Sequence, residues 1–177
     1  MSTRIAATVF VAGITIANLT VAHFGPWFSP INAFLLIGLD LTLRDWLHDR
    51  WRNQLWKIGA LIVAAGAISY MLNPAAGRIA IASVTAFTIA ATVDAIVYHR
   101  LIDMKWLVRS NGSNLAGAAA DSIVFPLVAF GLFPGVAVVI ALQWFAKVSG
   151  GAVWALILNR WRHNDRQEHN AAARIES

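Results

Sequence analysis

Six long apolar runs follow one another along the chain, and each approaches the length of a membrane-spanning helix. A helix needs about 20 mostly apolar residues to cross the hydrocarbon core of a bilayer. The chain has 177 residues, of which 58% are hydrophobic and 13% charged, whereas about a quarter of a typical soluble domain is charged. The sequence therefore predicts an all-α integral membrane protein with a single domain of six transmembrane helices at 1–159. We place the spans at residues 5–24, 31–47, 58–72, 79–98, 114–133 and 136–158.

Residues that disfavour helix separate these runs. Prolines within 25–30, at 73–74 and at 134–135 disfavour continuation of the preceding helix. The polar stretch Arg-Ser-Asn-Gly-Ser-Asn at 109–114 predicts a turn that caps the fifth helix, because Ser and Asn satisfy free N–H groups and Gly permits the bend. The first run is longer than the roughly 7–15-residue apolar core of a signal peptide, so we interpret it as a retained helix. We expect residues 160–177 to form a polar, frayed cytoplasmic tail.

Lysine and arginine are concentrated on one side of the predicted membrane. With six spans both termini lie on the same side, which carries twelve basic residues, against only Arg78 on the other, while Lys147 lies inside a span. Cytoplasmic loops are enriched in Lys and Arg, so we expect a multi-pass protein of the cell (inner) membrane with both termini cytoplasmic. Because these loops account for the net charge of +5, we expect no nucleic-acid partner. Tryptophans, which favour membrane interfaces, flank the span ends at Trp27, Trp46, Trp51, Trp56, Trp106 and Trp161.

Three aspartates and one lysine interrupt the apolar runs. Asp40 lies in the second span, Asp94 in the fourth, Asp121 in the fifth and Lys147 in the sixth. A charged side chain at the centre of a bilayer costs roughly 2.5–3.5 kcal/mol, and such residues usually face a partner, the bundle interior or a wet cavity. Asp-Ala-Ile-Val-Tyr at 94–98 and Asp-Ser-Ile-Val-Phe at 121–125 repeat a pentad in antiparallel helices, which hints at the inverted relation found in some transporters.

Helical spacing indicates which polar side chains share a face. Asn114, Asp121 and Phe125 align in the fifth span, and Phe87 aligns with Asp94 in the fourth. Small residues on both faces allow close helix approach, and an aromatic ring beside a polar group suits a flat, hydrogen-bonding ligand. Two interpretations remain open for the two aspartates: they line a functional site, or they are structural and bond to neighbouring backbone or amide groups.

Other polar side chains in the spans also allow two interpretations. Lys147 and Asp40 lie at similar depths, so we expect them to be mutual counter-ions near the midplane, in a functional or a purely structural pair. Gln143 shares the face of Lys147. Asn18 either bonds to a neighbouring helix or contacts a ligand.

Few features favour an enzyme. The chain has no cysteine, its five histidines lie at or beyond the ends of the spans, and no His-x-x-x-His or His-Glu pair occurs. A phosphate-binding Gly-rich loop ending in Gly-Lys-Ser/Thr is also absent from the sequence. We therefore expect no catalytic residue, metal site or cofactor, and keep an intramembrane enzyme as an alternative.

Five stretches carry a further indication: Ala-Asn at 17–18, Pro-Ile-Asn-Ala-Phe-Leu-Leu-Ile-Gly-Leu-Asp at 30–40, Arg-Ile-Ala-Ile-Ala-Ser at 78–83 leading to Asp94, and the stretches 109–114 and 121–125. Together they resemble the VUT family, the vitamin-uptake and queuosine-precursor transporters. The chain departs from the family pattern in three places. The Arg-Asp pair at 44–45 stands where the family tends to have an acidic residue, and Ala91 and Ala118 stand where it often has glutamine.

The resemblance implies a fold similar to the substrate-binding subunits of energy-coupling-factor transporters. It also implies uptake of a queuosine precursor, a 7-deazapurine such as preQ0 or preQ1, or of a related small heterocycle. The alternative is a substrate-binding membrane subunit that needs a separate ATPase module. Expected partners are the heterocycle, the lipid bilayer, and either an energy-coupling module or a second copy of the chain. The candidate substrate-binding residues are Asn18, Phe34, Asp40, Phe87, Asp94, Asn111, Asn114, Asp121, Phe125, Gln143 and Lys147.

Overall fold

Helices form all the regular structure in the described part of the chain. The computed structural model describes residues 2–51, 54 and 56–175, and the side chains of these residues except those at 45, 48, 49, 106, 107, 109, 110 and 158–175. Two short 3-10 segments and one π segment join the α-helices. In chain order the elements are α1 (Thr3–Phe24), η1 (Pro26–Phe28), α2 (Ser29–Asn32), the π segment η2 (Ala33–Ile37), α3 (Gly38–Arg50), α4 (Trp56–Leu72), η3 (Pro74–Ala76), α5 (Gly77–Arg100), α6 (Trp106–Phe130) and α7 (Val136–Ile175).

Among the residues that the structure describes, five helical segments are long and apolar enough to cross a membrane. They are Thr3–Phe24, Pro26–Arg44, Pro74–Arg100, Asn111–Phe130 and Val136–Ile157. The remaining predicted span, at 58–72, corresponds to α4, which is apolar but shorter. These segments confirm the predicted all-α, six-helix membrane fold.

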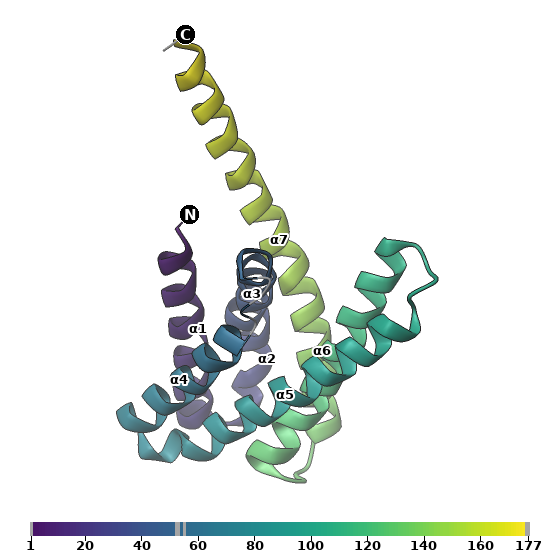
Figure 1. The fold of residues 1–177 in the computed structure, drawn as a ribbon. Coiled ribbons are helices and arrows are strands. Elements are labelled where there is room, and N and C mark those ends of the chain that lie inside the picture. Colours follow the sequence, from purple (N-terminus) through teal and green to yellow (C-terminus); the bar gives the residue numbers. More distant parts are fainter. Residues whose placement is uncertain (1, 52–53, 55, 176–177) are drawn as a thin grey trace.

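The chain passes back and forth between two ends of the molecule. Figure 1 shows the start of α1, the connection between α5 and α6, and the C-terminal part of α7 at one end. The connections that follow α1, α4 and α6 lie at the other end. This arrangement is the one that six successive passes require.

Glycines end α1 and α6 at the second of these ends. Gly25 has a φ of 82° and Gly131 a φ of 75°, a left-handed conformation that glycine adopts without steric cost. The predicted break at 25–30 is thus confirmed at Gly25. Pro30 lies instead within the first turn of α2, where its missing N–H has no helical partner to lose. The second span consequently starts before residue 31 and continues through η2 to Arg50.

The predicted turn at 109–114 is wrong, because this stretch lies inside α6. The connection from α5 occupies residues 101–105, and α6 begins at Trp106. The turn signal came from Ser, Asn and Gly, whose helix propensities fall short of alanine's by only about 0.5–1 kcal/mol each. The packing of α6 along α5 outweighs that preference. An added Cβ at Gly117 would lie 3.2 Å from the backbone oxygen of Ala90, so the two helices approach closely at this glycine.

The predicted frayed tail is also wrong for the backbone, because α7 continues as a helix to Ile175. Residues 158–175 contain neither glycine nor proline, and a polar composition alone does not end a helix. The side chains of this segment, including the predicted interfacial Trp161, lie outside the described residues, as does the side chain of Trp106.

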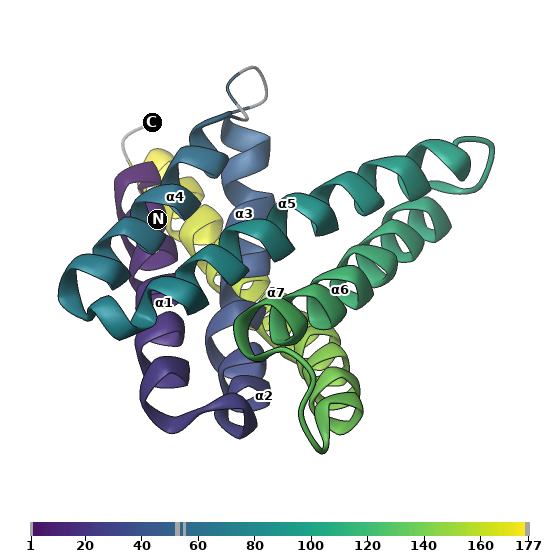
Figure 2. The same ribbon diagram turned by 90° about the horizontal axis from the view of Figure 1, so that it is seen from below.

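The helices pack as an apolar core, a helical hairpin and one long crossing helix. Buried side chains of α1, α3 and α4, among them Phe10, Leu43 and Ile62, form one apolar core. The antiparallel helices α5 and α6 form a hairpin that extends away from that core at its α5–α6 connection (Figure 2). Helix α7 crosses the second span at Gly38 and Gly150, where an added Cβ on Gly38 would lie 2.7 Å from the backbone carbon of Gly150.

Candidate substrate cavity

A cavity of about 610 Å³ lies between the helices of the bundle. It extends from Val21 and Ser29, close to the end of α1 and the start of α2, to Arg44 and Asn111 toward the opposite end. Volumes of about 300–1,000 Å³ are typical of small-molecule sites. Ten predicted site residues line the cavity: Asn18, Asp40, Phe87, Asp94, Asn111, Asn114, Asp121, Phe125, Gln143 and Lys147.

Phe34 is the predicted site residue that does not line this cavity, as far as the described residues define it. It belongs to η2, its side chain is 36% exposed, and its backbone packs directly against Gly150 of α7. Sequence spacing located Phe34 in the correct span. The spacing did not predict which way this part of the helix faces. That direction depends on the π segment at 33–37 and on the close contact between Gly38 and Gly150.

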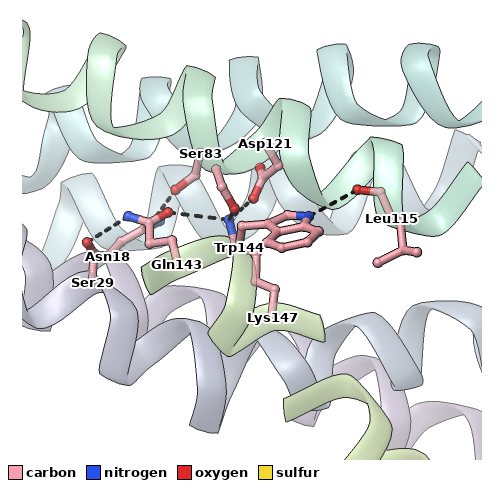
Figure 3. Close-up of polar contacts among 9 residues, drawn as sticks. Asn18, Ser29, Ser83, Leu115, Asp121, Gln143, Trp144 and Lys147 are labelled. Atoms are coloured by element: carbon pink, nitrogen blue, oxygen red, sulfur yellow. Dashed lines mark hydrogen bonds and ion pairs between the residues drawn. The ribbon is translucent and has the colours of Figure 1, made fainter. Parts of the chain in front are cut away.

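Lys147 is the centre of a polar cluster between α6 and α7 (Figure 3). Its Nζ forms an ion pair with Asp121 and donates hydrogen bonds to Ser122 Oγ at 3.3 Å and Gln143 Oε1 at 3.4 Å. An ammonium group has three donors, and here each has an acceptor. Gln143 Nε2 in turn donates to Ser29 Oγ at 2.7 Å. We call these five residues the Lys147 cluster; it joins α2, α6 and α7.

The predicted pair between Lys147 and Asp40 is wrong. Lys147 pairs with Asp121, and neither carboxylate oxygen of Asp40 has a hydrogen-bond partner. Asp40 packs instead against α1, where an added Cβ on Gly13 would lie 2.7 Å from its Oδ1. Similar depth made the pair plausible, but depth does not say which neighbouring helix each side chain faces.

Asp94 presents an unsatisfied acceptor in the wall of the cavity. The residue is half-buried, and its Oδ1 is buried without a hydrogen-bond partner. The close approach of α6 at Gly117 holds the side chain in place, because an added Cβ there would lie 3.3 Å from the Cβ of Asp94. Asp94 therefore lines the cavity with a carboxylate that no described group of the protein satisfies at Oδ1.

Asn18 has the structural role that was one of its two interpretations. Its Nδ2 donates to Ser69 Oγ on α4 at 3.2 Å, and its Oδ1 accepts from Ser83 Oγ on α5 at 2.6 Å. Asn18 is buried, and its two hydrogen bonds join α1 to α4 and to α5. The cavity reaches this side chain, but both ends of the amide already have partners.

The remaining predicted residues supply aromatic and amide surface. Phe87 and Phe125 are half-buried on α5 and α6, and Asn111 and Asn114 are exposed on α6. All four border the same cavity. The cavity therefore combines flat apolar rings with a few amides and carboxylates, a composition typical of small-molecule sites.

The family model described as "Putative vitamin uptake transporter" matches residues 4–160. The chain belongs to this family. Comparison with curated proteins and with solved structures finds no match. The matched range covers all six spans, so the family membership concerns the whole transmembrane domain and not a single motif.

The cavity of this vitamin uptake transporter family member also contains polar residues that were not among the predicted substrate-binding residues. Ser29, Asn32, Thr42, Arg44 and Ser83 also line it. Asn32 is satisfied by α1, since its Nδ2 donates to the Ala17 carbonyl oxygen at 3.1 Å and to Thr20 Oγ1 at 2.7 Å. The signal for the serine, threonine and asparagine residues was weak, because such side chains commonly bond to the backbone of their own or a neighbouring turn.

Within the described ranges no group of three or more His, Cys, Asp or Glu side chains is placed to hold a metal ion. The fold is that of a multi-pass membrane protein, and the family to which the chain belongs is described as one of vitamin uptake transporters.

Proposed function

We propose that this chain takes up a flat, polar heterocycle across the cell (inner) membrane, and that the substrate is a 7-deazapurine such as preQ0 or preQ1. The observation that carries the proposal is the cavity, whose lining includes the rings of Phe87 and Phe125 together with Asp94 and Asn114. Carboxylates and amides bond the edge of a base in bidentate fashion, and aromatic rings stack on its face.

The distribution of basic residues supports an orientation with both termini in the cytoplasm. A substrate from outside would then enter near Ser29 and Val21, where the cavity begins. It would reach Asp121 and Asp94 deeper in the membrane. The Lys147 cluster lies along that path and supplies a fixed, charge-neutral polar wall.

Uptake of labelled preQ0 by cells that lack their own transporter tests this function. We expect uptake above a vector control in cells that express this chain alone. Uptake only after an ATPase module is supplied would favour the alternative, a binding subunit of a larger transporter. No uptake in either case, with the protein shown to be in the membrane, would refute the proposed substrate.

A further inference from the structure

Asp40 is the buried carboxylate that the Lys147 cluster leaves without a partner. It is 4% exposed, and both of its oxygens are buried without a hydrogen bond. Its neighbour on α1 is Gly13, which offers no side chain at all. The carboxylate thus fills the space that any larger residue at position 13 would occupy.

The cations of the cavity are engaged elsewhere. Lys147 is bound to Asp121, Ser122 and Gln143, and the Arg44 guanidinium lies 5.9 Å from the centre of the Phe87 ring. The charged side chains that share the cavity with Asp40 are Arg44, Asp94, Asp121 and Lys147. Helices α1 and α4 pack against α3, the helix that carries Asp40. No described residue of α1 or α4 contributes a charged side chain to the cavity.

An isolated, buried charge is unfavourable, and in proteins such a group loses its charge instead. A hard metal cation would need about six oxygen ligands, and the described residues hold no group of three His, Cys, Asp or Glu side chains suited to a metal. Both oxygens of Asp40 are closed off from water, so a ligand there must bind without its hydration shell. A proton meets both requirements.

We propose that Asp40 is a proton-binding site in the wall of the cavity, whose proton exchanges with water only when α1 and α3 separate. Separation of Gly13 from Asp40 exposes the carboxyl group. The O–H bond then breaks, the electron pair stays on the carboxylate, and the proton passes to water to give hydronium. The reverse step, transfer of a proton from hydronium to the exposed carboxylate, reloads the site before the two helices close again.

The site gives the transporter a means of using a proton gradient, a consequence that rests on the proposed uptake function. Asp40 is protonated when α1 and α3 are packed together, and it loses its proton when they are apart. If substrate binding also depends on that arrangement, proton and substrate movements are linked. Asp121, which is ion-paired, and Asp94, which is half-buried, do not share this enclosed position.

Infrared spectroscopy of the purified chain at neutral pH tests the proton site without any substrate. Surface carboxyl groups are ionised there because their reference pKa values are about 4, so a carboxylic-acid carbonyl band that shifts in D₂O reports a buried, protonated group. We expect this band in the wild type, in Asp94→Asn and in Asp121→Asn, and its loss in Asp40→Asn. Absence of the band from the wild type, or its loss in Asp94→Asn, would overturn the assignment even if Asp40→Asn failed to fold.

Proteoliposomes test the coupling separately. We expect an inward proton gradient to accelerate preQ0 uptake by the wild type, and the ratio of uptake with and without the gradient to fall to unity in Asp40→Asn. An unchanged ratio in Asp40→Asn would overturn the coupling while the infrared result stood. If the wild type neither binds nor transports preQ0, the proposed function fails, and the infrared band still decides the proton site.

Discussion

Replacement of Lys147 by methionine removes the only charge that neutralises Asp121 among the described contacts, together with the hydrogen bonds to Ser122 and Gln143. Removing one partner of a buried ion pair typically costs 3–5 kcal/mol. The Lys147 side chain is 4% exposed, but Asp121 is 23% exposed in the cavity, so residual hydration of the carboxylate reduces the loss. We therefore expect the free energy of unfolding to fall by about 3 kcal/mol, the lower end of that range.

A double-mutant cycle isolates the pair. Free energies of unfolding would be measured by denaturant titration in detergent for Lys147→Met, Asp121→Asn and the double variant. We expect a coupling energy of about 2 kcal/mol, well above the roughly 0.6 kcal/mol average of hydrogen bonds between membrane helices. The control cycle pairs Lys147→Met with Asp40→Asn, for which we expect less than about 0.5 kcal/mol. A larger coupling to Asp40 than to Asp121 would refute the arrangement of the Lys147 cluster.

Two further variants, each with a matched control variant, test the helix contacts around the cavity. Gly150→Ala inserts a methyl group against the backbone of η2, so we expect a loss of about 1–3 kcal/mol. Gly59→Ala, whose methyl group meets nothing within 4 Å, should not destabilise, and equal unfolding curves for the two variants would contradict the close crossing. Asn18→Leu leaves two serine hydroxyls without their amide partner and should cost about 1–3 kcal/mol. Thr88→Val removes only an exposed bond within one helix and should cost less than about 0.5 kcal/mol; a similar loss in both would show that Asn18 does not join the helices.

The six spans were predictable because the membrane imposes their length. A bilayer demands about 20 apolar residues for each crossing, and that demand is visible in the sequence without knowledge of packing. Glycine and proline located the break after α1 correctly. The polar stretch 109–114 misled, because its residues favour a turn only weakly, whereas the contact of α6 with α5 extends along the helix.

The sequence predicted which residues line the cavity better than it predicted which of these residues bond to one another. Asp94, Asp121 and Lys147 were found because burying a charge in a membrane helix is costly and therefore conspicuous. Their partners depend on the rotation of each helix, which changes with local features such as the π segment at 33–37 and the contact of Gly38 with Gly150. The spacing of residues along one helix reveals neither the π segment nor the glycine contact. The sequence therefore predicts a pair between Lys147 and Asp40, and a place for Phe34 in the site, that the structure does not have.

Binding of preQ0 to the purified chain tests most directly whether this cavity is the substrate site. The matched variants are Asp94→Asn, which alters an unsatisfied acceptor in the cavity wall, and Asp103→Asn, which alters an exposed carboxylate outside the cavity. A hydrogen bond to a charged group contributes about 1.5–3 kcal/mol, so we expect Asp94→Asn to weaken binding at least tenfold and Asp103→Asn to leave it unchanged. Equal affinities for the wild type and Asp94→Asn, or no binding by the wild type, would contradict the account.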